Sequence, residues 1–205
     1  MSEALASASN RGSPTELDFS DTEIQTMLDN LDAYTSEEVV EIEKLVDELS
    51  TRRQNKLAHD DLMEFCQRMQ SDYIVGKHHK LLAGMLMDIE QGNKDRICVN
   101  IPPRHGKSQL VSIYFPAWFL GRNPNKKVMM VSHTTDLAVD FGRKVRNLLN
   151  TDEYRAIFPT VALASDSKSA GRWNTSLGGE YYACGIGSSI AGRGADLLLV
   201  DDPHS

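Results

Sequence analysis

Apolar residues in the first ninety positions recur at helical spacing. One stripe follows the i, i+3, i+4, i+7 pattern at Ile42, Leu45, Val46 and Leu49. Thr35 and Glu38 match a capping box, which predicts that this helix begins near position 35. Two more helices are expected over 60–70 and 78–91, the second closed by Gly92.

From Arg96 onward the pattern changes to short apolar runs that alternate with amphipathic segments. The apolar runs predict strands over 96–101, 127–132 and 196–202. The amphipathic segments predict helices from the 106–108 turn to about 120, over 135–149 and over 152–158. A β-hairpin is expected between 172–175 and 180–184. Such alternation predicts an α/β fold with a mostly parallel sheet covered by helices on both faces. The 196–202 run is typical of a central strand buried on both faces.

Composition and charge divide the chain into three predicted parts. Residues 1–20 are polar and rich in serine and are expected to be a disordered tail, 21–92 a helical appendage, and 93–205 the core domain. Residues 1–60 hold 14 acidic against 5 basic side chains, a net of −9, and the remainder has a net of +2. The core domain is therefore close to neutral, which permits but does not demonstrate a surface for DNA.

The composition argues against several other classes of protein. No apolar run approaches the ~20 residues that span a bilayer, and the N-terminus has no signal-peptide core, so no membrane partner is expected. The three cysteines include no CxxC pair, which argues against a disulfide framework or a zinc site and favours a reducing cytoplasm. The adjacent His78 and His79 point in different directions on a helix, and we interpret them as structural or surface residues.

The segment Gly106-Lys107-Ser108 lies between a predicted strand and a predicted helix. In that position a loop presents backbone N–H groups to phosphates, with Lys107 reaching the β- and γ-phosphates and the Ser108 hydroxyl ligating Mg²⁺. The predicted nucleotide-binding residues are Pro103, Arg104, His105, Gly106, Lys107, Ser108 and Gln109. The usual first glycine of the motif is replaced by Ile101. The sequence thus predicts binding of a nucleoside triphosphate.

Paired carboxylates end the last apolar run. Asp201 is predicted to hold Mg²⁺ and Asp202 to polarise the attacking water, because ligands of open α/β sheets bind at the carboxyl ends of strands. The alternative is a strand followed by an ordinary Asp-Asp-Pro turn. The phosphate-binding loop upstream favours the first interpretation.

An ordered series of motifs over about residues 78–205 resembles the N-terminal ATPase region of large terminase subunits, which package DNA into tailed-phage heads. The motifs are Pro-Pro-Arg-His-Gly-Lys-Ser at 102–108, Phe-Pro-Ala-Trp-Phe-Leu-Gly at 115–121, Trp-Asn-Thr at 173–175 with Gly178-Gly179, and Gly-Arg-Gly-Ala-Asp-Leu-Leu-Leu-Val-Asp-Asp-Pro at 192–203. The resemblance implies a P-loop ATPase of the additional-strand class, in which another strand lies between the phosphate-loop strand and the carboxylate strand.

The resemblance also implies roles for single residues. Lys107 corresponds to the phosphate-binding lysine, Ser108 and Asp201 to the Mg²⁺ ligands, and Asp202 to a catalytic carboxylate that is often a longer glutamate. Such motors use an arginine finger. Arg193, in a glycine-flanked loop, is the first candidate in trans, and Arg104 is expected to sense the γ-phosphate in cis.

By the same resemblance, the expected function is Mg²⁺-dependent ATP hydrolysis coupled to translocation of double-stranded DNA into the procapsid. The implied partners are the portal, the small terminase subunit and further copies in a ring, in the host cytoplasm and not in the mature virion. The sequence ends soon after Asp202, so we expect an incomplete sheet, no nuclease domain in this chain, and weak or absent activity of the chain alone. Three alternatives remain open: a fragment, one product of a split gene that a second polypeptide completes, and a natural truncation with a changed role.

Two other functions remain open on the sequence alone. One is another P-loop ATPase, such as a helicase or a small-molecule kinase. The other is a non-catalytic interaction module with acidic helices and a vestigial nucleotide site.

Overall fold

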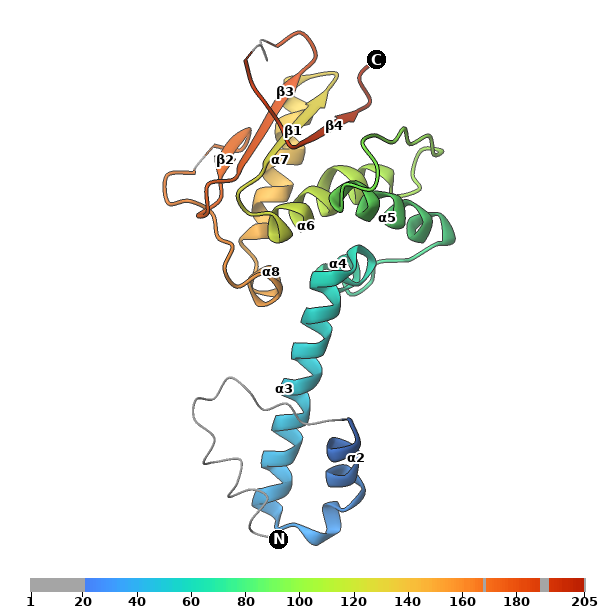
Figure 1. Ribbon diagram of the computed structural model, residues 1–205, viewed down its shortest axis with the longest axis vertical. Helices are drawn as coiled ribbons and strands as arrows, with labels where there is room; N and C mark the ends of the chain where they lie inside the picture. Colours follow the sequence, from blue (N-terminus) through green and yellow to red (C-terminus); the bar gives the residue numbers. More distant parts are fainter. Residues whose placement is uncertain (1–20, 168, 189–191, 205) are drawn as a thin grey trace. The chain divides into compact units, whose positions relative to one another are not determined.

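The computed structural model describes residues 21–167, 169–188 and 192–204, so the predicted tail over 1–20 lies outside the described residues. Figure 1 shows the arrangement of the elements. The helices are α2 (Asp21–Asp29), η1 (Leu31–Ala33), α3 (Ser36–Asp60), α4 (Leu62–Met69), α5 (Lys77–Glu90), the π-helix η2 (Gln109–Tyr114), α6 (Phe115–Arg122), α7 (Thr135–Leu149) and α8 (Asp152–Ile157). The strands are β1 (Lys127–Ser132), β2 (Arg172–Asn174), β3 (Glu180–Gly185) and β4 (Leu197–Asp201).

The chain divides into two compact units between Arg52 and Arg53. In the first unit, the predicted capping box at the start of α3 is confirmed. The backbone N–H of Thr35 donates to Glu38 Oε2 at 2.8 Å, and the Glu38 N–H donates to Thr35 Oγ1 at 3.4 Å. Ile42 and Leu49 of the predicted stripe are buried, so the helical spacing identified the inward face correctly.

The second unit contains a four-stranded mixed sheet in the order β2-β3-β1-β4. β1 pairs in parallel with β3 on one side and β4 on the other, whereas β2 and β3 form the predicted antiparallel hairpin. Helix α7 packs against β1 and β3, and η2 contacts β4 (Figure 1). The predictions of an α/β fold, of β1, of α7 and of α8 are confirmed.

Helices α4 and α5 share one hydrophobic core with the sheet. Phe65 of α4 and Leu82 of α5 belong to the same buried cluster as Val128 of β1. The fully buried Trp118 of α6 donates its indole N–H to the backbone oxygen of Ala58, 3.1 Å away. The helical residues from Arg53 onward therefore support the sheet and are buried together with it.

The hairpin motif has a packing role. Trp173 is stacked on Tyr181, with ring centroids 4.9 Å apart and planes 3° from parallel, and both side chains are fully buried. The turn between β2 and β3 contains Gly178, whose φ of 90° favours glycine. A Cβ on Gly179 would collide with the Pro124 carbonyl. Two adjacent glycines are thus needed for separate physical reasons.

One predicted strand is absent. Residues 96–101 form no strand, although Ile97, Val99 and Ile101 pack half-buried against the core at alternate positions. The alternation was correctly recognised, but a strand also needs a neighbouring backbone to pair with. Among the described residues none pairs with this segment, so the prediction of a strand over 96–101 was wrong.

The burial predicted for the carboxylate strand was also wrong. β4 is at the edge of the sheet, and its burial alternates, with Leu198 58% and Val200 53% exposed. Only the face that carries Leu197, Leu199 and Asp201 is buried. The apolar run identified the strand but not its position, because η2 covers one face and β1 pairs with only one edge.

Candidate nucleotide-binding site

The candidate site is built where the phosphate-loop sequence meets the carboxyl end of β4. The Lys107 ammonium lies 2.9 Å from Asp202 Oδ1 and 3.2 Å from Asp201 Oδ1, although 95 positions separate Lys107 from Asp202. The fold therefore brings together the lysine and both carboxylates that were predicted from separate motifs. The hydrogen bond to Asp202, with that to Asp201, raises the pKa of Lys107 above its ordinary value, so the side chain stays an ammonium group.

The two carboxylates differ in environment. Asp201, 6% exposed, is the last residue of β4, whereas the side chain of Asp202 is 70% exposed. Asp202 also has a φ of 44°, in the left-handed region that non-glycine residues seldom adopt. A buried carboxylate suits a fixed ligand, and an exposed one can reach solvent.

Ser112 is a site residue that sequence reasoning missed. Its buried hydroxyl donates to Asp201 Oδ2 at 2.8 Å, and Asp201 is held further by Ser132, whose hydroxyl donates to the Asp201 backbone oxygen at 2.8 Å. Ser112 lies four positions after Ser108 and so follows it on one side of the helical segment. That spacing was the only sequence feature that could have pointed to Ser112, and it places Ser112 beside Asp201 only because η2 packs on β4.

The backbone of the loop is left-handed at two positions, and one of them, Arg104, is strained. Arg104 has a φ of 64° and Gly106 a φ of 76°. The left-handed conformation costs a non-glycine residue of order 1 kcal/mol, so Arg104 is held there by its surroundings. After Gly106 the chain becomes helical at Lys107, continues through η2, and ends in α6. The first free N–H groups of this helical run therefore belong to the predicted phosphate loop.

The remaining loop residues are placed as follows. Pro103, Arg104 and His105 are exposed, and Ser108 is half-buried. The His105 ring nitrogen Nδ1 lies 2.9 Å from the Pro103 carbonyl oxygen. Gln109 points away from the loop, since its amide donates to the Gln70 side chain at 2.8 Å.

Arg193 lies in a different place. Its guanidinium carbon is 4.1 Å from the centroid of the Tyr182 ring, and its Nη1 is 3.8 Å from Glu180 Oε1. Glu180 begins β3 and is in register with Lys127, the first residue of β1. Arg193 is therefore near the amino ends of the parallel strands, whereas Asp201 is at a carboxyl end.

The donor set can hold a hard cation only in part. Asp201 and Ser108 offer oxygen atoms, which suit Mg²⁺, but within the described ranges no group of three or more His, Cys, Asp or Glu side chains could hold a metal. Mg²⁺ in nucleotide sites is commonly bound by one or two carboxylates together with substrate phosphates. The residues present fit that arrangement. The described part of the chain contains no helix long and apolar enough to cross a membrane.

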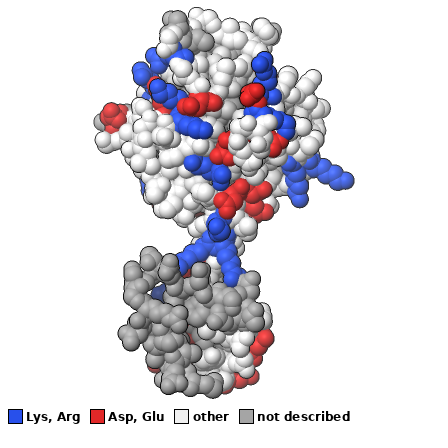
Figure 2. All heavy atoms as spheres, viewed as in Figure 1, with Lys and Arg blue, Asp and Glu red and all other residues white. Residues whose placement is uncertain are grey.

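The mixture of charges on the surface is visible in Figure 2. On the face drawn there, lysine and arginine side chains are interspersed with acidic ones over the sheet-containing unit. Several oppositely charged pairs of this unit are close in sequence, such as Lys144 with Asp140 at 2.7 Å and Arg172 with Glu180 at 2.7 Å. This face has no single continuous basic stripe.

A family model described as the N-terminal part of the T4-like large terminase subunit matches residues 98–204. The chain belongs to this family. Searches of curated proteins and of solved structures found no match. The match confirms the resemblance that the motifs indicated, and it spans the phosphate-loop sequence and both carboxylates of this terminase chain. Residues before Cys98, including α5, lie outside the match.

Proposed function

We propose that this terminase chain binds Mg-ATP at the Lys107 site and forms the hydrolytic part of a phage DNA-packaging motor. The observation that carries the proposal is the convergence of Lys107 with Asp201 and Asp202 at hydrogen-bond distance. A loop lysine beside a carboxylate at the end of a neighbouring strand is the arrangement that ATP hydrolysis in P-loop enzymes requires.

The proposed fold class is a P-loop ATPase with an additional strand. It is supported by the parallel pairing of β1 with β4 and by the loop that leads into the helical run at Lys107. The position of β4 at the edge of the sheet, and the unpaired segment over 96–101, are compatible with a further strand between them in the assembled motor.

Each residue has a distinct proposed role. Lys107 would exchange its carboxylate partners for the β- and γ-phosphates, and Pro103 to Ser108 would surround the triphosphate. Gln109 would have to leave Gln70 to join them. Ser108 and Asp201 would hold Mg²⁺, which would neutralise charge on the phosphates. The hydrogen bond from Ser112 to Asp201 keeps one carboxylate oxygen engaged and the other directed toward Lys107.

Asp202 would orient the attacking water and take up its proton. In this step the water oxygen forms a bond to the γ-phosphorus, and the bond from that phosphorus to the β,γ-bridging oxygen breaks. ADP and inorganic phosphate are released, and the proton leaves through the exposed carboxylate to solvent. The 70% exposure of the Asp202 side chain supports a route to water.

Arginine would stabilise the charge that develops in this step. Arg104 is beside the loop and exposed, which suits contact with the γ-phosphate of the same chain. Arg193 is bound to Tyr182 and Glu180 within its own chain, so a role as a finger in trans would require it to leave both.

The proposed partners follow from the family. They are double-stranded DNA, the portal of the procapsid, the small terminase subunit and neighbouring copies in a ring, in the host cytoplasm. Coupling of hydrolysis to DNA movement is part of this proposal.

Titration with a fluorescent ATP analogue, with and without Mg²⁺, tests the site in the chain as it stands. We expect saturable binding that is at least about tenfold tighter with Mg²⁺. An affinity that does not depend on Mg²⁺, or the absence of binding, would indicate a vestigial site in an interaction module. Hydrolysis that neither DNA nor procapsids stimulate would instead favour another class of P-loop ATPase.

A further inference from the structure

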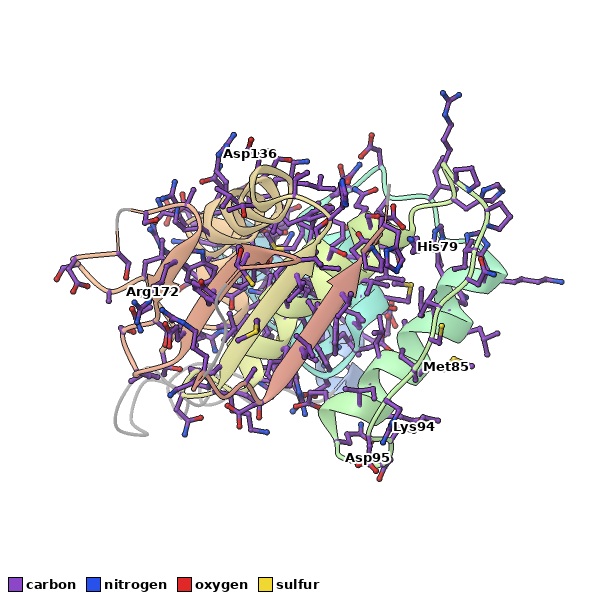
Figure 3. All side chains as sticks on the ribbon, turned by 90° about the horizontal axis from the view of Figure 1, so that it is seen from above. His79, Met85, Lys94, Asp95, Asp136 and Arg172 are labelled. Carbon is purple, nitrogen blue, oxygen red and sulfur yellow. The ribbon has the colours of Figure 1, made fainter. Side chains whose placement is uncertain are left out.

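The buried imidazole of His79 lies directly beneath the phosphate loop. His79 is in the first turn of α5, is 9% exposed, and its Nε2 is 3.0 Å from the backbone oxygen of His105. Figure 3 shows His79 at one end of α5, with Lys94 and Asp95 beyond the other end. A side chain 26 positions upstream thus contacts the loop itself.

The tautomer of His79 follows from its second contact. The backbone N–H of Gly76 donates to His79 Nδ1 at 3.0 Å, so Nδ1 is an acceptor and carries no proton. In the neutral ring the proton is then on Nε2, which donates to the His105 carbonyl. His78 Nε2 lies 3.1 Å from the same nitrogen and 3.3 Å from the same carbonyl oxygen, so both imidazoles converge on the His105 carbonyl and do not point in different directions as the sequence suggested.

The His79 imidazole leaves no room for a side chain at Gly106. A Cβ on Gly106 would lie 2.6 Å from His79 Nε2, closer than real contacts allow. Glycine is therefore required here by its neighbour as well as by its φ of 76°. The ring occupies the space that a side chain at position 106 would fill.

Because the peptide between His105 and Gly106 is planar, the contact of His79 with the His105 carbonyl also fixes the direction of the Gly106 N–H. In a trans peptide the C=O and N–H groups point in opposite directions. The His105 carbonyl is bound by His79, so the Gly106 N–H of the same peptide points away from α5, toward the open side of the loop. Backbone N–H groups on that side are the ones that phosphates bind.

We propose that His79 is a positioning residue for the phosphate loop: it fixes the His105–Gly106 peptide so that the Gly106 N–H is aimed at a bound phosphate. The inference rests on the proposed nucleotide site and adds a residue that lies outside the family match. Tyr73 holds the other side of the ring, with centroids 5.6 Å apart, and burial raises the pKa of its phenol, which stays neutral.

A purely structural role, capping α5 through Gly76, is the competing explanation, and two substitutions separate the roles. His79→Asn keeps a short acceptor for the Gly76 N–H but cannot reach His105. His79→Gln carries a longer amide, whose oxygen can accept from the Gly76 N–H as glutamine does at this position of a capping box, and whose N–H can donate to His105. His59→Gln, on a half-buried imidazole of α3 that contacts Asp60 and Phe158, is the control.

We expect His79→Asn to weaken binding of the fluorescent Mg-ATP analogue about fivefold, the effect of one lost hydrogen bond, while thermal unfolding changes little. His79→Gln, which can make both contacts, should retain affinity to within about twofold and leave the unfolding midpoint close to that of wild type. If His79→Asn binds as tightly as wild type, or if the losses of affinity simply follow the losses of stability, the inference is overturned and the nucleotide site stands.

Amide hydrogen exchange of the chain without nucleotide keeps the two proposals separable. His79→Asn should speed exchange across 103–110 about fivefold, and His79→Gln and His59→Gln should not. If wild type fails to bind the analogue but the exchange pattern holds, the proposed function fails and His79 still positions the loop. Equal exchange in all variants would refute the positioning role.

Discussion

The two ends of the sheet each carry a cluster of cations and carboxylates, but of different kinds. At the carboxyl end, Lys107 meets the buried Asp201, from a distant part of the sequence. At the amino end, Arg193 stacks on Tyr182 and lies 3.8 Å from Glu180. Arg172 also binds Glu180, and Figure 3 shows Arg172 and His79 beyond opposite edge strands of the sheet.

The two clusters differ in how far their carboxylates are buried and in the strain of the backbone beside them. A buried carboxylate is costly unless it is paired, and Asp201 is held by Ser112 and Lys107. At the amino end Glu180, 18% exposed, is paired with Arg172, which is 57% exposed, and pairs with such an exposed partner are worth roughly 0–1 kcal/mol. Strained backbone also gathers at the carboxyl end, at Arg104 and Asp202. Buried charge beside strained backbone is typical of a functional site, whereas the amino-end cluster resembles surface pairing.

The largest expected effect is that of removing the lysine. Lys107→Ala should weaken binding of the Mg-ATP analogue about 10- to 150-fold, because a charged hydrogen bond to phosphate contributes roughly 1.5–3 kcal/mol. Lys144→Ala, an exposed lysine paired with Asp140, is the control and should bind as wild type does. Equal affinities of the two variants would contradict the assignment of the nucleotide site to the Lys107 cluster at the carboxyl end of the sheet.

The next effect distinguishes the two ends of one strand. Asp201→Asn should reduce the enhancement of affinity by Mg²⁺ about tenfold, because the amide keeps an acceptor for Ser112 but loses the charge that a cation needs. Asp196→Asn, at the start of the same strand, where the carboxylate accepts from the Lys127 N–H at 2.7 Å, should keep the full Mg²⁺ effect. Titrations over a range of Mg²⁺ concentrations measure both, and a loss in Asp196→Asn alone would contradict the assignment.

Ser112→Ala tests the support of the carboxylate. It leaves a buried oxygen of Asp201 without its donor, which costs about 1–3 kcal/mol in urea unfolding and a few-fold in affinity. Ser176→Ala, at an exposed position near the hairpin, serves as the comparison. An unchanged unfolding midpoint for Ser112→Ala would show that the hydroxyl does not hold Asp201.

The pH dependence of stability provides a smaller effect. The folded pKa of Lys107 is raised above its ordinary value of 10.5, chiefly by the hydrogen bond to Asp202. The stabilisation from its ammonium group is therefore fully present below the unfolded pKa and is lost as the pH rises through the folded pKa. The difference in urea midpoint between wild type and Lys107→Met should shrink between about pH 9 and 12. A difference in urea midpoint that grows between these pH values would contradict a raised pKa of Lys107 in the folded protein.

The smallest effect is expected at the amino end. Arg193→Ala should change the affinity of the isolated chain for the Mg-ATP analogue by less than about twofold and lower stability by about 0.5–1 kcal/mol, the cation–π contribution of a partly exposed pair. A tenfold loss of affinity would place Arg193 in the site of its own chain. In the assembled motor, a loss of turnover with unchanged affinity would support the role in trans.

Elements that form from local contacts were predictable. The predicted bounds of β1, over 127–132, and of α7, over 135–149, agree with the structure, since alternation and helical periodicity are properties of neighbouring residues. The strand over 96–101 was not predictable in this way. Its alternating burial is present, but pairing depends on which backbone lies beside it, and that is decided far away in the sequence.

The candidate site shows the same division. Lys107 and Asp201 were identified because each lies in a motif whose chemistry is evident from neighbouring residues. Ser112 and His79 were not, because a lone serine and a histidine pair have no such context. Each becomes meaningful only through one hydrogen bond, to Asp201 and to the His105 carbonyl.

The sequence by itself determined the α/β class, the family and the identity of the lysine and its carboxylates, because these follow from local periodicity and from ordered motifs. Only the tertiary structure decided that β4 is an edge strand, that Arg193 is at the amino end of the sheet, and that an imidazole of α5 contacts the backbone carbonyl of His105. The physical reason is that sheet order and side-chain contact between distant segments depend on packing of the whole core, which no short window of sequence contains.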